Sequence, residues 1–315
     1  MTVSVVVPVY NSESSLVALL DRLESALAPI AASYEIILVN DGSRDQSWSV
    51  IAREAAARPG VIGIDLSRNY GQHNALLCGI RTARHEIIIT IDDDLQNPPE
   101  VIPTLLDRLS QGYDVVYGSP EREAHGLWRD LASQTTKLVL GKVLGADTAR
   151  QVCGFRAFRR DLRSAFHDYH GPAVNLDVLL TWATTRFTAV RVRHEPRRAG
   201  ESNYTFTKLV THAMNMLTGF STLPLQLATL LGFCLTLFGA ILLVVVLARY
   251  LIQGVKVPGF TFLASVTVIF SGAQLFTLGV IGEYLARMHF RVMEKPSYSV
   301  RTRVGAVDAA AAVRT

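Results

Sequence analysis

Three consecutive carboxylates, Asp92, Asp93 and Asp94, are the residues best suited to chemistry, and they follow the apolar run EIIITI. Carboxylates this close repel one another, and a hard divalent cation relieves the repulsion. Alternation along an extended chain places Asp92 and Asp94 on one side and Asp93 on the other, and Gln96 could approach as a third oxygen or through water. The pattern predicts a Mg²⁺ or Mn²⁺ site that shares its ion with substrate phosphate oxygens. The alternative is an acidic loop that caps a helix beginning at Asn97-Pro98-Pro99-Glu100.

Polar clusters also follow three other apolar runs, as Tyr10-Asn11, Asp41-Gly42-Ser43 and Ser67-Arg68-Asn69. Ligands bind parallel sheets outside the carboxyl ends of the strands, and all four clusters fall at such ends. Strands that alternate with helices predict an α/β fold with a mainly parallel, doubly wound sheet. The expected strands are 3–9, 35–39, 61–66 and 86–91, and the expected amphipathic helices are 11–28, 45–57 and 72–83.

The composition adds a membrane segment to this α/β part. Of 315 residues, 49% are hydrophobic and only 18% are charged, and the mean hydropathy is +0.25. These values disfavour a single soluble domain, whose charged fraction is about 25%, and they exclude a disordered or fibrous chain. The excess lies in two uncharged runs, Leu225–Ala248 and Val257–Gly282, each long enough to span a membrane. We therefore expect a two-helix transmembrane hairpin.

Basic residues flank the two runs asymmetrically. Arginines and lysines crowd the segments 191–208 and 287–303, whereas the connection between the runs holds only Arg249 and Lys256. This bias predicts that the N-terminal part and both termini are cytoplasmic, on the inner face of the cell membrane. The apolar run at 3–9 is too short for a signal peptide and lacks a basic leader.

The remaining composition names no further partner. The net charge of +4 is modest, and three scattered cysteines exclude a disulfide framework or a thiolate zinc site. The segment 205–223 could be an interfacial helix or an ordinary helix packed on the soluble part. The expected parts are a ligand-binding α/β domain at 1–204, a juxtamembrane segment at 205–223, two transmembrane helices at 224–285 and a cytosolic tail at 286–315.

The motifs VVPVYNSESSL, VNDGSRD, SRNYGQHNAL and IDDDLQNPPE occur in the order and spacing typical of family 2 glycosyltransferases with the Rossmann-like GT-A fold. Together with GFRAFRR, RRAGESNYTFTKL, the apolar runs and GEYLARM, they make the chain resemble the polyprenyl-phosphate glycosyltransferases. Those include dolichyl-phosphate mannose synthases and bacterial undecaprenyl-phosphate sugar transferases. NYGQH, LQNPPE and GYDVV are most similar to the subfamily that transfers 4-deoxy-4-formamido-L-arabinose. The resemblance covers nearly the whole chain.

This resemblance implies roles for individual residues. The family's DxD metal motif falls on Asp92 and Asp94, with Gln96 beside them. Any single arginine assigned to the acceptor could instead be a solvated or lipid-facing basic residue. The nucleotide-sugar-binding roles fall on Pro8, Tyr10, Glu13, Asp41, Arg68 and Asp93. The lipid-phosphate-binding roles fall on Arg122, Arg129, Arg198 and Ser202, and the catalytic set is Asp92, Asp94, Arg122, Arg129 and Arg198.

Three departures from the family pattern bear on these roles. The family often has Glu directly after the Tyr-Asn pair, whereas this chain has Ser12 there and Glu13 one step later. The middle residue of the DxD motif is commonly Ala and is Asp93 here. The late Gly-x-Ser-Lys-Tyr pattern has Asn203 in place of lysine, which removes one expected cation near the phosphates.

Two further residues have open interpretations. His73 follows the third expected strand and could touch uracil or diphosphate, or be a structural histidine. Asp177 could face the donor sugar or start a helix.

The expected activity is an inverting, metal-dependent transfer of one sugar from a nucleotide donor, UDP-linked, to polyprenyl phosphate of the undecaprenyl type, for cell-envelope glycan or lipid modification. The acceptor phosphate needs no general base, because its second pKa is about 6 and it is already an anion at neutral pH. The expected partners are the donor, the acceptor and membrane lipid, without nucleic acid, and related transferases form homotetramers.

Two alternatives stand beside this activity. A processive polysaccharide synthase carries a Gln-x-x-Arg-Trp motif, which none of Trp48, Trp128 and Trp182 matches. A non-catalytic membrane scaffold on the same fold would not need the intact acidic triplet.

Overall fold

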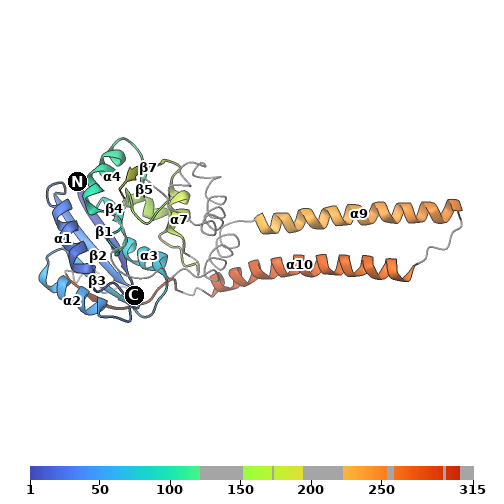
Figure 1. The fold of residues 1–315 in the computed structure, drawn as a ribbon, viewed down its shortest axis with the longest axis horizontal. Coiled ribbons are helices and arrows are strands. Elements are labelled where there is room, and N and C mark those ends of the chain that lie inside the picture. The colour runs from blue at the N-terminus through green and yellow to red at the C-terminus, as the bar shows by residue number, and fades with distance from the viewer. Residues whose placement is uncertain (121–151, 172–173, 194–222, 254–258, 294–295, 306–315) are drawn as a thin grey trace. The chain divides into compact units, whose positions relative to one another are not determined.

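The computed structural model describes residues 1–120, 152–171, 174–193, 223–253, 259–293 and 296–305. The chain divides into two compact units (Figure 1). The first unit combines Met1–Phe206 with Glu294–Thr315, and the second comprises Thr207–Met293. The C-terminal residues therefore belong to the same unit as the N-terminus, although the second unit separates them in the sequence.

An eight-stranded sheet in the order β7-β5-β6-β4-β1-β2-β3-β8 forms the centre of the first unit. Neighbouring strands are parallel except where β6 and β8 meet their neighbours. The predicted α/β fold with a mainly parallel sheet is confirmed, and the antiparallel strands β6 and β8 were not predicted. The strands are β1 (Thr2–Val9), β2 (Ser33–Asn40), β3 (Val61–Leu66), β4 (Ile87–Thr90), β5 (Val115–Pro120), β6 (Arg156–Arg159), β7 (Phe187–Val192) and β8 (Val300–Val304).

Helices cover both faces of this sheet, with α1, α2 and α4 on one side and α3 and α7 on the other (Figure 1). β1 shows why the central strands are mostly apolar. Val5 and Val7 belong to the core beneath α1 and α4, whereas Val6 lies under Gly79 of α3. A strand buried on both faces needs apolar residues at every position. The helices are α1 (Leu16–Leu27), α2 (Ser47–Ala57), α3 (Gln72–Thr82), α4 (Ile102–Ser110) and α7 (Leu176–Ala183), with short 3-10 segments at Pro99–Val101 and Arg160–Phe166.

Helix α1 (Leu16–Leu27) confirms the helix predicted over 11–28, but its predicted start at Asn11 and Ser12 was wrong. Asn11 adopts a positive φ of 54°, which ends the strand in a turn instead of opening a helix. The backbone N–H of Asn11 donates to Ser43 Oγ, and that of Ser12 donates to Ser47 Oγ. These contacts with the end of β2 and the start of α2 hold residues 11–15 as a loop at the sheet edge.

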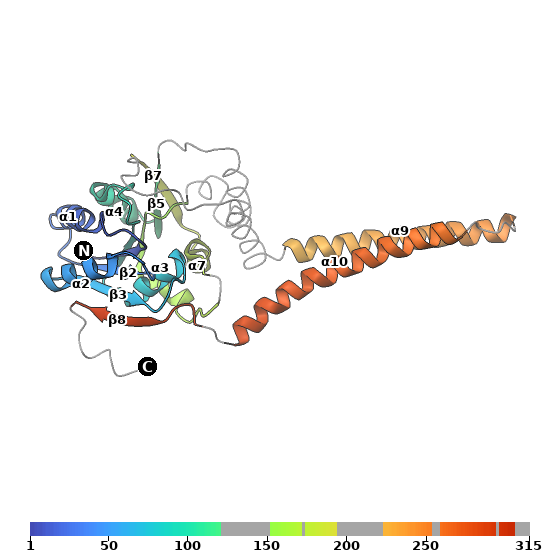
Figure 2. The ribbon, with the colours of Figure 1, turned by 60° about the horizontal axis from the view of Figure 1, so that its bottom comes forward.

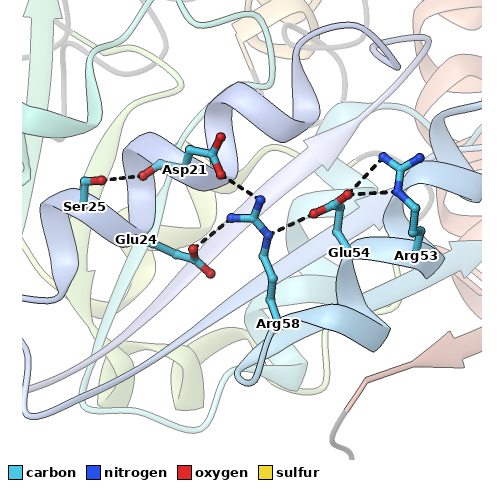
Figure 3. Close-up of polar contacts among 6 residues, drawn as sticks. All are labelled: Asp21, Glu24, Ser25, Arg53, Glu54 and Arg58. Atoms are coloured by element: carbon cyan, nitrogen blue, oxygen red, sulfur yellow. Dashed lines mark hydrogen bonds and ion pairs between the residues drawn. The ribbon is translucent and has the colours of Figure 1, made fainter.

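A cluster of charged side chains ties α1 to α2 (Figure 3). The Arg58 guanidinium contacts carboxylates of Asp21 and Glu24 on α1, at 2.7 and 2.8 Å, and of Glu54 on α2, at 2.9 Å. Arg53 also donates to Glu54, whose side chain is only 10% exposed. Burial opposes ionisation of Glu54, but Arg53 and Arg58 hold the pKa of that carboxyl below its usual value. The cluster fixes the relative position of the two helices whose preceding loops meet at the sheet edge.

The second unit contains two long helices, α9 (Leu223–Gln253) and α10 (Phe260–Val292), which lie side by side (Figures 1 and 2). Within them, Pro224–Val245 and Ile269–Ala286 are long and apolar enough to cross a membrane. Only 6% of the first segment and none of the second is buried. Large apolar side chains therefore cover their surfaces, as in a membrane hairpin. The predicted juxtamembrane segment at 205–223 lies, except for Leu223, outside the described residues.

Candidate active site

The polar residues after β1, β2, β3 and β4 meet at one edge of the sheet. These four strands are parallel neighbours, so their carboxyl ends point the same way. The loops that follow them are 10–15, 41–46, 67–71 and 91–98, and each carries a polar cluster noted in the sequence. The edge is therefore the place where a ligand can meet side chains from all four loops.

Asp92 lies at the centre of the edge, at the end of β4. Its Oδ1 accepts a hydrogen bond of 2.7 Å from Gln72 Nε2 at the start of α3. A Cβ at Gly154 would lie 2.4 Å from Asp92 Oδ2, so glycine is needed there to leave room for the carboxylate. Burial, followed by the charges of Asp94 and Asp93, raises the pKa of Asp92 to about 6. The carboxylate is thus held in a setting where a cation would stabilise its charged form.

Asp93 turns instead toward the end of β1. Its Oδ2 accepts hydrogen bonds from the backbone N–H of Tyr10 at 3.0 Å and from Ser12 Oγ at 2.5 Å. Ser15 Oγ donates to the Asp93 carbonyl oxygen at 2.7 Å. Burial raises the pKa of Asp93, and the bonds from Ser12 and Tyr10 act against that rise. The Asp93 carboxylate therefore links the loop after β4 to the loop after β1 through hydrogen bonds within the protein.

Asp94 begins a tight turn that leads to the next helix. Its Oδ1 accepts a 3.1 Å hydrogen bond from the backbone N–H of Gln96. Between them, Leu95 is buried and has a φ of +61°, a conformation that a branched side chain rarely adopts. Burial of the Leu95 side chain holds this strained turn in place and fixes where the Asp94 carboxylate projects.

Protein side chains at this edge can supply only some of the ligands that a hard divalent cation needs. Among the described residues, no group of three or more His, Cys, Asp or Glu side chains converges as a closed metal site. Asp93 is directed to Ser12, whereas the carboxylates of Asp92 and Asp94 accept from Gln72 and from the Gln96 backbone. Two carboxylates with remaining positions for water and phosphate oxygens is the arrangement that Mg²⁺ usually accepts. The residues present therefore fit an ion that is shared with a phosphate-bearing ligand.

Asp41, at the end of β2, organises the loop after β3. Its two carboxylate oxygens accept hydrogen bonds from the backbone N–H groups of Tyr70, at 2.6 Å, and Gly71, at 2.8 Å. Burial raises the pKa of Asp41, and these two bonds oppose the rise. Gly42 has a φ of +66°, and a Cβ there would lie 2.6 Å from the backbone nitrogen of Asn69. The loops after β2 and β3 are therefore in direct backbone contact, which any larger residue at position 42 would prevent.

Other candidate residues lie around this centre. The Arg68 guanidinium stacks over the Tyr70 ring, 4.7 Å from its centroid. Tyr10 is 38% exposed at the mouth of the edge, and Pro8 is buried within β1. Glu13 accepts a 2.7 Å hydrogen bond from the backbone N–H of Gln46 at the start of α2. Glu13 therefore stabilises the loop, as Asp93 does, while Tyr10 and Arg68 remain open to a ligand.

Four residues predicted for the acceptor phosphate lie outside the described residues: Arg122, Arg129, Arg198 and Ser202. The described edge therefore includes the residues predicted for the metal and the donor, and their roles stay predictions, like those of the acceptor residues. His73, the other open candidate, accepts a 3.3 Å hydrogen bond at Nδ1 from the backbone N–H of Leu176. That contact gives His73 a structural role between α3 and α7.

Sequence reasoning missed a buried ion pair behind Asp92. Arg156 on β6 is 2% exposed, and its guanidinium contacts Asp177 on α7 at 2.5 Å. Asp177 also accepts a 3.0 Å hydrogen bond from the Tyr117 hydroxyl. The positive charge of Arg156 lowers the pKa of Asp92, against the larger effect of burial. The motif GFRAFRR held the only signal for this arginine, and Asp177 starts α7 as one of its two interpretations proposed.

The sequence is similar to known proteins over nearly its whole length. Residues 4–166 match the family described as Glycosyl transferase family 2. Over 96% of its length, the chain is 38% identical to the undecaprenyl-phosphate 4-deoxy-4-formamido-L-arabinose transferase of Pectobacterium atrosepticum, of which it covers 94%. It is 37% identical to the transferase of the same name from Pseudomonas paraeruginosa, with 98% of this chain and 92% of the relative aligned.

A solved structure shows the fold of the first unit. The glucosyl-3-phosphoglycerate synthase of Mycobacterium tuberculosis, determined with Mn²⁺ and UDP-glucose, superposes with a TM-score of 0.52. The match covers 69% of this chain and 77% of that one, at 18% sequence identity. The shared architecture is the GT-A fold.

Proposed function

Because the chain belongs to glycosyl transferase family 2, we propose that it transfers a single sugar, with inversion, from a UDP-linked donor to an undecaprenyl-type polyprenyl phosphate. The observation that carries the proposal is the pair of carboxylates, Asp92 and Asp94, at the carboxyl edge of the parallel sheet. The names of the two relatives described above make 4-deoxy-4-formamido-L-arabinose the first sugar to test.

Asp92 and Asp94 would hold Mg²⁺ or Mn²⁺, with Gln96 beside them. When bound, such an ion neutralises charge that builds up on the leaving diphosphate. The chain prepares its side of this site before any ligand arrives. Gln72 and Gly154 fix the Asp92 carboxylate, and the turn at Leu95 directs that of Asp94. Pre-positioned ligands lose little entropy on binding, which favours a shared ion.

The donor nucleotide would lie over the loops after β1, β2 and β3. The Asp41 carboxylate, already fixed by two backbone N–H groups, retains lone pairs that can accept a uracil N–H. Tyr10 offers an exposed aromatic ring from one side. Arg68, stacked on Tyr70, offers a guanidinium from the other, and this group suits a diphosphate.

The acceptor phosphate would attack the anomeric carbon directly. A phosphate monoester has a second pKa of about 6, so it is an anion at neutral pH and no carboxylate has to remove a proton. Arginines bind phosphate through forked donors, and Arg122, Arg129 and Arg198, with Ser202, are the proposed residues. The two apolar helices would anchor the enzyme in the inner membrane, where its acceptor lies, with both termini and the first unit in the cytoplasm.

Product identification tests this proposal. Purified full-length protein in detergent would be incubated with Mn²⁺, undecaprenyl phosphate and a panel of UDP- and GDP-linked sugars that includes UDP-4-deoxy-4-formamido-L-arabinose. Mass spectrometry should show a lipid that carries one sugar through one phosphate, and only with a UDP-linked donor. A polymeric product, or free sugar without glycosylated lipid, would reject the proposal.

A further inference from the structure

The strand β8 lies along the sheet beside β3 (Figure 2). The two strands are antiparallel, with Gly63 opposite Val304 and Asp65 opposite Thr302. The next residue of β3, Leu66, is opposite Val300, so the register skips one residue of β8, Arg301. A residue left over in this way forms a β-bulge, which leaves the ladder and can aim its side chain at a neighbouring site.

Arg301 is aimed at the loop that follows β3, residues 67–71, here called the donor loop. Its guanidinium donates to the Ser67 carbonyl oxygen at 2.6 Å and contacts Asp65 Oδ2 at 3.3 Å. The backbone N–H of Ser67 donates to the Ser299 carbonyl oxygen at 2.9 Å, and the two serine hydroxyls lie 3.4 Å apart. The N–H, the carbonyl and the hydroxyl of Ser67 thus all bond to the C-terminal segment.

The other end of the donor loop is held by Asp41, through the N–H groups of Tyr70 and Gly71. A second link joins the two holds. Asp65 Oδ1 accepts a 2.7 Å hydrogen bond from Asn40 Nδ2, and Asn40 directly precedes Asp41. Arg301, Asp65 and Asn40 therefore form a continuous polar chain from β8 to the end of β2.

Resting on the function proposed above, we propose that β8 positions the donor loop for binding of a nucleoside diphosphate, and that Arg301 is the positioning residue. Arg301 need not touch the nucleotide. It fixes Ser67, and with it the placement of Arg68 and of the Tyr70 and Gly71 amides that orient Asp41. The segment that follows the apolar helices is then part of the donor site rather than a tail.

A purely structural role for β8 predicts different behaviour. An added strand covers the open side of the outermost strand, here β3, through its backbone hydrogen bonds and its apolar contacts. Arg301 lies outside that ladder, and its side chain is 61% exposed. Asp65 is buried, but it keeps its hydrogen bond from Asn40 when Arg301 is removed, and the Arg301 guanidinium lies mostly in solvent. Loss of Arg301 should therefore leave the fold intact while it loosens the donor loop. The two roles can therefore be separated at this one residue.

The test compares Arg301→Ala with Arg301→Lys and with Arg303→Ala in the full-length protein. Arg303 lies on the same strand and carries the same charge. Within the described part of the chain, no contact joins it to the donor loop. Calorimetry with UDP and Mn²⁺ should show about a tenfold higher Kd for Arg301→Ala, a smaller rise for Arg301→Lys and a Kd within about twofold of wild type for Arg303→Ala. The KM for the nucleotide sugar should rise with the Kd, while kcat changes by less than about threefold.

Hydrogen exchange supplies a readout that does not depend on activity. The Tyr70 and Gly71 amides should exchange faster in Arg301→Ala than in wild type, at unchanged melting temperature. Equal UDP affinity and equal exchange in Arg301→Ala and wild type would overturn the inference, as would equal losses in Arg301→Ala and Arg303→Ala. Wild-type protein that binds no UDP would overturn the proposed function instead, and the exchange of the two amides would then decide the role of Arg301 alone.

Discussion

Ser12 Oγ donates a hydrogen bond of 2.5 Å to Asp93 Oδ2, so the middle carboxylate of the acidic triplet is bound to the end of β1. Asp93 therefore holds two loops together. We propose that its two neighbours, Asp92 and Asp94, are the carboxylates that bind a cation.

Replacement of Ser12 tests this division of roles. Ser12→Ala should destabilise the protein by about 1–2 kcal/mol, because it removes a hydrogen bond to a carboxylate that is partly buried. Thermal melting of the metal-free protein would measure the loss, with Ser49→Ala, an exposed serine on α2, as the control. Metal affinity should change little. A large loss of Mn²⁺ binding in Ser12→Ala at unchanged stability would show that Asp93 is a ligand after all.

The raised pKa of Asp92, about 6, predicts how stability depends on pH in the metal-free protein. The unfolded chain releases this proton near 3.8, the usual value, whereas the folded protein keeps it up to about 6. The folded state thus binds more protons between these values, and its stability falls as the pH rises through this interval. Asp92→Asn should therefore raise the melting temperature above pH 6 in EDTA, and the gain should vanish below pH 4.

The matched comparison for that experiment is Asp107→Asn on the exposed side of α4. Equal effects of the two substitutions at all pH values would contradict the assignment of the effect to Asp92.

The ion pairs of Arg58 should make stability depend on pH in the direction opposite to Asp92, so that stability is lost as the pH falls. Arg53 and Arg58 keep the pKa of Glu54 below its usual value, so the stabilisation is present at neutral pH and is lost as the pH falls through that lowered pKa. Arg58→Met should cost about 2 kcal/mol at pH 7 and less at pH 3, since it leaves three carboxylates with weaker partners. Arg22→Met, which removes the ion pair with the exposed carboxylate of Glu100, should cost about 1 kcal/mol, less than Arg58→Met. Equal costs for the two variants would refute the cluster's importance.

Arg156 should matter for both stability and metal binding. Arg156→Met leaves Asp177 buried without its ion-pair partner, which costs about 3–5 kcal/mol. Arg156→Met combined with Asp177→Leu should recover much of the stability, because an apolar pair can replace a buried ion pair. Loss of the Arg156 charge should lower Mn²⁺ affinity only through its effect on the ionisation of Asp92. Calorimetry at pH 6 and pH 8 would measure this effect. If the double variant regains full stability and Mn²⁺ binding keeps its pH dependence, Arg156 does not influence the metal site.

Much of the fold was predictable because its signals are local. The runs at 3–9 and 61–66 are apolar at nearly every position, as in parallel strands buried on both faces, and strands form there. The acidic triplet and Asp41 were predicted to lie together because they follow such strands, and the structure places them at the same end of the sheet. Helix α1 began later than predicted because Asn11 and Ser12 bond to residues more than 30 positions away.

The parts that could not be predicted depend on distant pairing. The segment VRTRV is charged and short, and only its partner β3, more than 200 residues earlier, makes it a strand. The Gln72 amide that holds Asp92 looks like any polar residue at the start of a helix. Arg156 is invisible for a related reason, since its burial depends on Asp177 and Tyr117 from other elements.

The most direct test of the whole account is metal-dependent transfer by Asp94→Asn. Purified full-length wild type, Asp94→Asn and the control Asp107→Asn would be given Mn²⁺, undecaprenyl phosphate and the donor that the wild type accepts. We expect Asp94→Asn to form the monoglycosyl lipid at least about 100-fold more slowly, because a carboxylate ligand is lost, while Asp107→Asn matches wild type. Full, metal-dependent lipid glycosylation by folded Asp94→Asn would contradict it.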